Sequence, residues 1–440
     1  MAKACIALAA ALLISIAFIT HGKIQSYKFM KIPKIEPVNG IQREVSDMLL
    51  DAINGENIKA NLRAFTKEPH QILSRMSGRA VPLDWQGSLN VTYRTGPGLV
   101  DGQNLTVDVM SQLENRHIRN VIGYIPGSDE DDRYVILGNH FDAWVYGSID
   151  PNAGTAILAE VARAMVETSN KTGWKPARTI MFAAWDGEEY GLLGSTEFVE
   201  EFVQQLGGRA VAYLNMDSFQ GNSSLHVNTI PTLYDIVIEV AKKIPNPNEE
   251  QVHLGRKTLY DTWSVMFPGK PGTGMPEMLI PPGNSDHASF LNFAGVPVVD
   301  FKFKNETVRG KYPLYHTMYE TPFVNEHLYD NEGFADMDKL SPPSQLFEAK
   351  QQVLLLEKAA QGNPFDQRKL RGVNERIIMV ERCFINPRGA PNFPESRHVL
   401  FSISDKDAYS SRNMAALYES MDVFENAEDN KAAGRAVAMQ

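Results

Sequence analysis

Histidine and carboxylate side chains follow three apolar runs of this 440-residue chain, and side chains of these types bind metal ions or transfer protons. In chain order they are His140, Asp142, Glu188, Glu189 and Asp217. Imidazole nitrogen and carboxylate oxygen are ligands that zinc takes in about fourfold coordination. The sequence therefore predicts a zinc site where the apolar runs end.

The apolar runs themselves have the composition of buried β-strands. They are 133–137 (RYVIL), 179–185 (TIMFAAW) and 210–216 (AVAYLNM), with a fourth at 296–303 (VPVVDFKF). Helical spacing of apolar residues is found between them, at 153–167, 194–205 and 233–244. This alternation predicts an α/β fold with a mostly parallel sheet and helices on both faces. Ligands bind at the carboxyl ends of parallel strands, so the polar residues should meet at one sheet edge.

Each of these residues also has a simpler explanation when it is taken alone. Asp217 after a strand is a common turn residue, and Asp150 before Pro151 is typical of a helix start. A lone histidine such as His316 is usually a surface residue or a satisfied core residue. Together and in order at three strand ends, these residues are better explained by a shared site.

Four segments resemble the di-zinc peptidases of the glutamate carboxypeptidase II family, which have the M28 aminopeptidase-type fold. The segments are GNHFDAWVYGSIDPNAG, FAAWDGEEYGLLGSTE, YLNMDS and YPLYHTMYET, and they occur in the order that the family has. The similarity runs from about residue 40 to 410. It implies a zinc exopeptidase fold followed by a C-terminal helical dimerisation domain, and hence a homodimer.

The resemblance also implies how two zinc ions would be held. Asp150 bridges the two ions in this arrangement. His140 and Asp217 bind one ion, and Glu189 and His316 bind the other. These five residues are the predicted metal ligands.

The resemblance assigns catalytic roles to residues next to these ligands. Glu188 is the general base, which takes a proton from the bridging water and passes it to the leaving amine. Tyr315 donates a hydrogen bond to the oxyanion. Asp142, two residues after His140, is placed to accept the second N–H group of that imidazole.

The implied reaction is removal of a C-terminal residue, glutamate in this family, from small peptides. The residues that would select glutamate depart from the family pattern. Asp300 and Lys302 stand about where the family has two arginines that recognise an acidic residue. Lys406 and Tyr409 resemble, with altered spacing, a Lys-Tyr pair that binds the terminal glutamate.

Three parts are expected along the chain: a membrane anchor or signal segment at 1–21, a zinc peptidase domain at 36–334 and a helical dimerisation domain at 335–440. Helices are predicted in the last part at 345–360, 374–383 and 414–424. The family's protease-associated domain is expected to be absent near residues 70–75, because 61–70 is followed almost at once by sequence resembling the far side of that insertion. Glu197 and Glu200 match two ligands of a structural calcium whose other ligands lie in absent sequence, so zinc is the expected cofactor and calcium stays open.

An apolar run at 4–20 predicts a retained membrane anchor, with a cleaved signal peptide as the alternative. Lysines beyond this run outnumber Lys3, which argues against a cytoplasmic N-terminus. Because an anchor and a signal peptide would both place the body of the protein outside the cytosol, we expect a single-pass type II membrane protein with an extracellular catalytic domain, or a secreted protein. Five N-x-S/T triplets agree with a glycosylated ectodomain. They begin at Asn90, Asn104, Asn170, Asn222 and Asn305.

Composition excludes several other classes. A net charge of −10 without a long Lys/Arg run argues against nucleic-acid binding. Only Cys5 and Cys383 are present, so neither a disulfide framework nor a cysteine metal site is expected. Two alternatives to a carboxypeptidase stay open: a catalytically weak or inactive receptor-like ectodomain of the same fold, and an aminopeptidase of the same superfamily.

Overall fold

The computed structural model describes part of the chain, in segments separated by gaps. The described residues are 79–80, 94–95, 115–219, 224–246, 248–304, 312, 314–327, 367–389, 394, 396–403, 411–414 and 418. Within them no helix is long and apolar enough to cross a membrane. The predicted anchor at 1–21, the junction near 70–75, the helix at 345–360 and most of the helix at 414–424 lie outside these residues.

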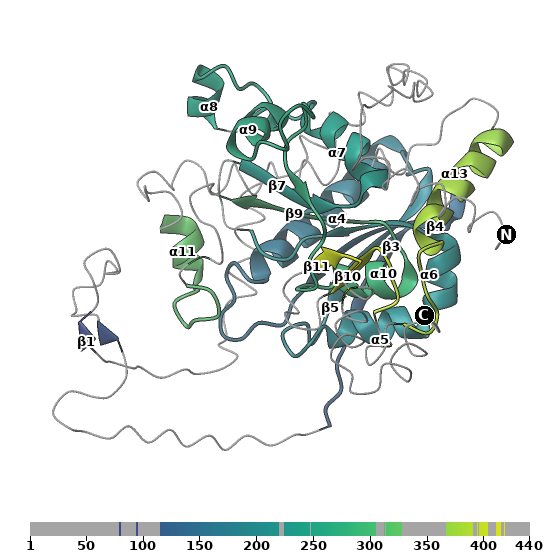
Figure 1. The fold of residues 1–440 in the computed structure, drawn as a ribbon, viewed down its shortest axis with the longest axis horizontal. Helices are drawn as coiled ribbons and strands as arrows, with labels where there is room; N and C mark the ends of the chain where they lie inside the picture. Colours follow the sequence, from purple (N-terminus) through teal and green to yellow (C-terminus); the bar gives the residue numbers. More distant parts are fainter. Residues whose placement is uncertain are drawn as a thin grey trace.

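Within the described residues, a seven-stranded sheet is the frame of the fold, with the strand order β3-β5-β4-β6-β9-β7-β8 (Figure 1). Its strands are β3 (Val121–Ile125), β4 (Glu130–His140), β5 (Arg178–Trp185), β6 (Ala210–Asn215), β7 (Ser224–Thr229), β8 (Met278–Leu279) and β9 (Val298–Lys304). The neighbours β5, β4, β6 and β9 run parallel, whereas β3 and β7 run antiparallel to β5 and β9. The prediction of a mostly parallel sheet is confirmed, and its four predicted strands form this parallel centre.

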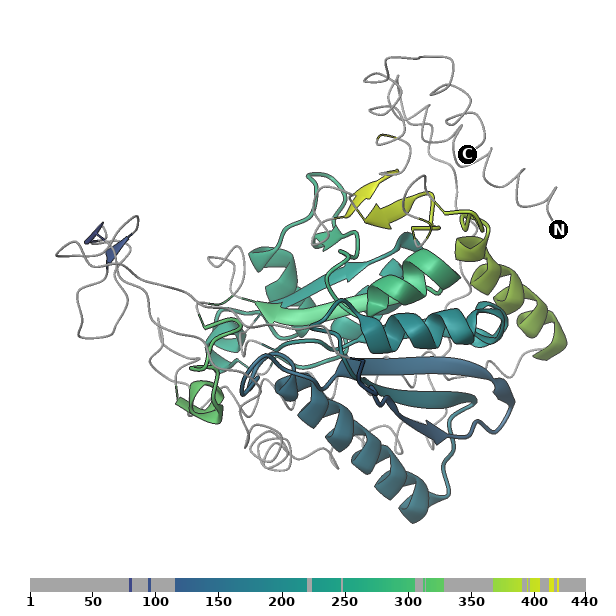
Figure 2. The same ribbon diagram turned by 90° about the horizontal axis from the view of Figure 1, so that it is seen from below.

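Helices cover both faces of the sheet, as predicted. One face carries α4 (Asn152–Thr172), α7 (Tyr234–Ala241) and α9 (Leu259–Met266). The other face carries α5 (Leu193–Glu201), α6 (Val203–Arg209) and α10 (His287–Ala294). Figure 2 shows α4 and α10 on opposite sides of the strands.

The apolar runs are continuous because successive side chains of each strand point to opposite faces of the sheet and pack in two different cores. On β4, Val135 and Leu137 pack in the core under α4, whereas Ile136 packs in the core under α5 and α10. On β5, Ile180 belongs to the first core and Met181 to the second. Because both faces are buried, the central residues of these strands are almost all apolar.

The helix predicted at 194–205 is two helices in the structure. The backbone breaks at Phe202, which ends α5 and precedes α6 with φ −107° and ψ 20°. The helix predicted at 153–167 extends to Thr172 as α4, and Gly173 ends it in the left-handed conformation with φ 72°. The remaining short elements are β1 (Arg79–Ala80), β2 (Arg94–Thr95), the 3₁₀ turn η3 (Pro231–Leu233), α8 (Glu249–His253) and α11 (Pro322–His327).

The C-terminal part contains α13 (Gln367–Arg382), which begins seven residues before the predicted 374–383 helix and ends one residue before the end of that prediction. It also contains the antiparallel pair β10 (Phe401–Ile403) and β11 (Ser411–Asn413). The sequence analysis expected a helical dimerisation domain at 335–440 and did not predict these two strands. Their lengths of three residues each leave too little alternation to detect in the sequence.

Arg382 joins α13 to the sheet layer. Its guanidinium donates to the carbonyl oxygens of Gly207 (3.2 Å) and Ala210 (2.5 Å) at the end of α6, and also to that of Ile378. Burial lowers the pKa of Arg382 to about 10. A cation at a helix C-terminus also interacts favourably with the helix dipole, so Arg382 should be a main attachment of the C-terminal part.

We expect Arg382→Met to lower the free energy of unfolding by about 1–3 kcal/mol, because it removes the hydrogen bonds that join α13 to the carbonyl oxygens of Gly207 and Ala210. Urea denaturation followed by circular dichroism measures the change. Arg388→Met is the matched control, since Arg388 is exposed in a loop and its replacement should change stability by less than about 0.5 kcal/mol. Equal stability of the two variants would contradict this role for Arg382.

Candidate metal centre

The predicted site residues come from loops at the carboxyl ends of the parallel strands. His140 is the last residue of β4, and Asp217 follows β6 by two residues. Glu188 and Glu189 lie in the loop between β5 and α5. Because these three strands are neighbours in the sheet, their ends converge on one edge.

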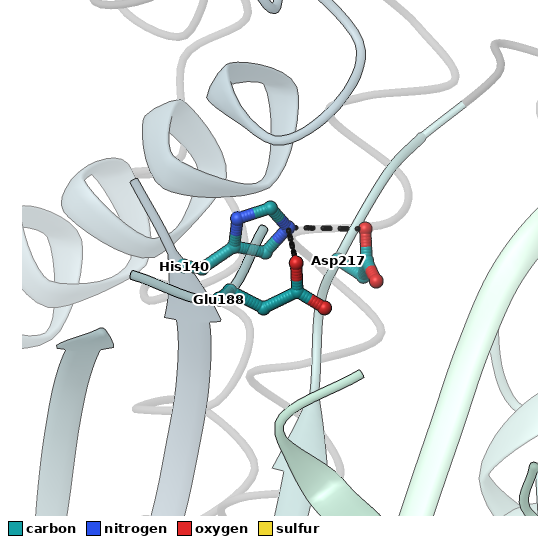
Figure 3. A group of neighbouring side chains, drawn as sticks. All are labelled: His140, Glu188 and Asp217. Carbon is teal, nitrogen blue, oxygen red and sulfur yellow. Dashed lines mark hydrogen bonds and ion pairs between the residues drawn. The ribbon is translucent and has the colours of Figure 1, made fainter. Parts of the chain in front are cut away.

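His140, Glu188 and Asp217 form the first group of possible metal-binding atoms (Figure 3). The Nε2 atom of His140 lies 3.4 Å from Asp217 Oδ1 and 3.9 Å from Glu188 Oε2. The possible donor atoms of these three residues all lie within 4.8 Å of one another. Figure 3 shows the two carboxylates pointing to the same side of the imidazole.

Asp150, Glu189 and His316 form the second group. His316 Nε2 lies 3.1 Å from Glu189 Oε2 and 3.4 Å from Asp150 Oδ2. The other oxygen of Asp150, Oδ1, lies 3.2 Å from His140 Nε2 in the first group. The two oxygens of Asp150 therefore face different groups, which is the placement that a bridging carboxylate needs.

The chemistry of these atoms fits metal ions. His316 Nε2, Asp150 Oδ1 and Glu189 Oε1 are buried and make no hydrogen bond with the described residues. Buried carboxylates are stable only when they are paired, hydrogen-bonded or bound to metal. The donor set of imidazole nitrogen and carboxylate oxygen is one that zinc accepts. These buried atoms therefore lack hydrogen-bond partners among the described residues and are of the types that bind cations.

The surrounding charges change the proton affinity of both histidines. Burial opposes a charge on His140, but neighbouring carboxylates, Glu188 first among them, raise its pKa well above the ordinary value. Burial also opposes a charge on His316, but the nearby carboxylates of Asp150 and Glu189 raise its pKa to about 9. The surrounding carboxylates thus favour the protonated form of both imidazoles when no metal competes.

The pKa of Glu188 is shifted upward, whereas the pKa of a carboxylate in an ordinary ion pair is shifted downward. Burial raises its pKa well above the ordinary value, and the negative charges of Asp217 and Asp286 add to this effect while His140 opposes it. A carboxylate whose pKa is raised binds a proton more readily than a free carboxylate. The role of Glu188 as general base stays a prediction.

Asp142 has a broader role than the sequence predicted. Its carboxylate accepts hydrogen bonds from the backbone N–H groups of Glu188 (3.0 Å) and Glu189 (3.1 Å). His140 Nδ1 lies closer to the carbonyl oxygen of Asp142 (3.1 Å) than to its carboxylate (3.5 Å). Asp142 thus orients the imidazole mainly through its backbone, and its side chain holds the loop that carries the two glutamates.

Tyr315 lies against His316, with ring centroids 3.5 Å apart. Trp144 is close to the same imidazole, at 6.2 Å between centroids. His316 has a φ of 58°, an uncommon value for a residue with a side chain, so its neighbours must hold it in place. The predicted donation from the Tyr315 hydroxyl to an oxyanion stays a prediction.

Lys302 lies on β9 with its ammonium group 3.6 Å from Asp300 Oδ2. Asp300 also accepts hydrogen bonds from Asn215 (3.1 Å) and Asn228 (2.9 Å). Burial opposes the charge on Lys302, but Asp300 and then Asp217 raise its pKa. Lys302 is thus paired with Asp300 near the metal centre, and its predicted contact with substrate stays a prediction.

Other predicted residues are less informative. Glu197 and Glu200 are both exposed on α5, and their part in a calcium site stays a prediction. Asn170 is exposed near the end of α4. The rest lie outside the described residues: Lys406, Tyr409, Asn90, Asn104, Asn222 and Asn305.

Two buried carboxylates near the centre were missed by the sequence analysis. Asp286, just before α10, is fully buried, and burial raises its pKa to about 7. Glu320 is 1% exposed and accepts a hydrogen bond from the backbone N–H of Asp150. In the sequence, Asp286 precedes an apolar helix and so resembles an ordinary helix cap. Glu320 lies in the YPLYHTMYET segment, and the family resemblance of that segment was the one sequence feature that could have indicated it.

Comparison with known proteins agrees with this geometry. Residues 120–331 match the model of peptidase family M28, and residues 334–439 match that of the transferrin receptor-like dimerisation domain. A glutamate carboxypeptidase 2 homolog of Caenorhabditis briggsae is 49% identical, over 82% of this chain and 56% of the relative. Its counterpart in Caenorhabditis elegans is also 49% identical, over 81% and 55%. The aminopeptidase NAALADL1 of Rattus norvegicus is 31% identical, over 80% and 55%. The chain thus spans about half the length of the curated relatives that it matches.

Proposed function

Because residues 120–331 of this chain belong to peptidase family M28, we propose that the protein is a di-zinc metallopeptidase of the carboxypeptidase type. The observation that carries the proposal is the pair of donor groups joined by Asp150. His140 and Asp217 would hold one ion, Glu189 and His316 the other, with Asp150 between them. Calcium is not part of the proposal.

Two bound zinc ions would lower the pKa of a shared water molecule and polarise the peptide carbonyl group. The protein supplies the proton transfer. Glu188 accepts the proton from the attacking water and delivers it to the leaving amine, for which its buried position beside the ligand Glu189 is suitable. Tyr315 donates its hydroxyl hydrogen to the developing oxyanion.

We propose small peptides as substrates, with release of a C-terminal residue and glutamate as the first residue to test. Support comes from the 49% identity to two relatives that are named glutamate carboxypeptidase 2 homologs. The ammonium group of Lys302 is paired with Asp300. Selection of an acidic substrate side chain is therefore the part of the proposal that most needs a test.

An aminopeptidase is the second candidate, supported by the 31% identity to a relative of that name. Two peptide series separate the candidates, one with an acetylated N-terminus and one with an amidated C-terminus. A carboxypeptidase cleaves the first series and spares the second, whereas an aminopeptidase does the reverse. A receptor-like protein cleaves neither, so inactivity on both series would contradict the enzymatic proposal.

We also propose a homodimer that forms through the C-terminal part, supported by the dimerisation-domain match at residues 334–439. A glycosylated type II membrane protein with its catalytic domain outside the cell is the proposed setting, and a secreted protein is the alternative. No nucleic-acid partner is proposed. The protease-associated domain is proposed to be absent.

Zinc affinity should increase as the pH rises from 6 to 8. The pKa of His316 is raised to about 9 and that of His140 is raised well above its ordinary value, so both imidazoles bind protons more tightly than a free histidine in the metal-free protein. Zinc must displace these protons, and each displaced proton makes the affinity rise by about tenfold per pH unit. Competition with a chelator of known affinity at each pH measures the slope. An affinity that does not change with pH would contradict the placement of both histidines among the ligands.

A further inference from the structure

We propose that Glu320 is a positioning residue that fixes Asp150 between the two metal groups. The inference rests on the proposed function, because it takes Asp150 as a ligand shared by two ions. Glu320 itself would touch neither metal nor substrate. It acts through the backbone of the loop that carries Asp150.

One oxygen of Glu320 receives three hydrogen bonds. Its Oε1 accepts from the backbone N–H groups of Ile149 (3.0 Å) and Asp150 (2.5 Å) and from the hydroxyl of Tyr312 (2.7 Å). The side chain is buried, with 1% of the residue exposed. Three donors converge on this one buried oxygen, so it is a firm attachment for the Asp150 backbone.

The same two segments are also joined by contacts that do not involve the Glu320 carboxylate. The backbone N–H of Ser148 donates to the carbonyl oxygen of Glu320 (3.0 Å). The side-chain amide of Asn325 donates to the carbonyl oxygen (2.7 Å) and the hydroxyl oxygen (2.9 Å) of Ser148. The loop before α4 is therefore attached along its length to the segment that carries Glu320.

That segment also carries His316, four residues before Glu320. Glu320 thereby connects the proposed bridging ligand to a ligand of the second ion. The connection sets the 3.4 Å distance between Asp150 Oδ2 and His316 Nε2. A shift of the Asp150 backbone would move the shared ligand relative to both ions at once.

A second buried carboxylate beside Asp150 is not expected to stabilise the fold by itself. Two negative charges in a buried site repel each other, and neutral groups of similar shape often serve stability equally well or better. A carboxylate is favoured if the Asp150 backbone must be held in one place while the Asp150 side chain is committed to metal. This requirement distinguishes a positioning role from a packing role.

The test compares zinc affinity in three purified full-length variants by chelator competition. Glu320→Gln keeps the side-chain shape but removes the charge, and it should weaken zinc binding by about 10- to 100-fold, the loss typical of residues that orient metal ligands. Tyr312→Phe removes one of the three donors and should weaken binding by a smaller factor, which provides a test if Glu320→Gln does not fold. Glu381→Gln is the matched control, because Glu381 is an equally buried carboxylate that pairs with His398 and Thr232 instead.

The outcomes separate this inference from the proposed function. Weaker zinc binding in Glu320→Gln and Tyr312→Phe, with wild-type binding in Glu381→Gln, would support the inference. Wild-type zinc affinity in both test variants would overturn it and leave the proposed function intact. A wild-type protein that binds no zinc would overturn the proposed function and this inference with it. A thermal melt of each metal-free variant shows whether a loss of affinity is only a loss of fold.

Discussion

The Glu188→Gln variant is expected to lose peptidase activity by about 100- to 10,000-fold while it keeps its metal, since general acid–base catalysis contributes factors of this size. Glutamine has nearly the same shape as glutamate, but its amide cannot accept the proton of the attacking water. Glu188 is not one of the five proposed ligands, so their donor atoms are unchanged in the variant. The loss should appear in kcat, because the proton is transferred in the chemical step.

Peptide hydrolysis and metal content have to be measured on the same preparation of this variant. Glu201→Gln is a suitable control, because Glu201 is an exposed carboxylate of α5, the helix that follows the Glu188 loop. The control should keep wild-type activity. A Glu188→Gln protein that hydrolyses peptides within threefold of the wild-type rate would contradict the assignment of Glu188 as general base.

Replacing Asp150 by asparagine should remove both metal ions rather than one. The two carboxylate oxygens face different histidines, at 3.2 Å from His140 and 3.4 Å from His316. An amide has only one oxygen and no net charge, so it cannot serve two cations. We expect zinc affinity at both positions to fall by more than about 100-fold, beyond the loss typical of residues that only orient ligands.

Asp217→Asn is the comparison for this experiment. Asp217 lies in the first group only, 3.4 Å from His140, so its replacement should empty one position and leave the second position occupied. Metal analysis of the two variants after dialysis against dilute chelator gives the stoichiometries. If Asp150→Asn retained one tightly bound ion, as expected for Asp217→Asn, Asp150 would not be the shared ligand.

The strands that build the site could be predicted because they are buried on both faces. The runs at 133–137, 179–185 and 210–216 are almost continuously apolar, and each is followed by residues of types that can bind metal. The edges of the sheet lacked this signal. Val121 and Tyr124 of β3 are exposed, so β3 lacks the continuous apolar pattern of a buried strand. Strand β7 carries buried polar residues such as His226 and Asn228, which obscure its apolar pattern.

The candidate ligands at the strand ends could be predicted from local sequence, whereas the residues that hold them in position could not. Asp142 was found because it lies two residues from His140, but its side chain holds the backbone of Glu188 and Glu189 in another loop. Glu320 lies 170 residues from Asp150 in sequence, and only the fold brings them together. The pairing of the predicted metal ligands came from family resemblance. The structure places His140 and Asp217 in one group together with Glu188, and Glu189 and His316 in a second group together with Asp150.

Zinc content tests the central claim most directly. The purified protein, dialysed against metal-free buffer and analysed by plasma mass spectrometry, should contain two zinc ions per chain. Removal of this zinc should abolish peptide hydrolysis, and its return should restore it. A stably folded protein that contains no zinc and takes up none when zinc is supplied would contradict the proposed metal centre.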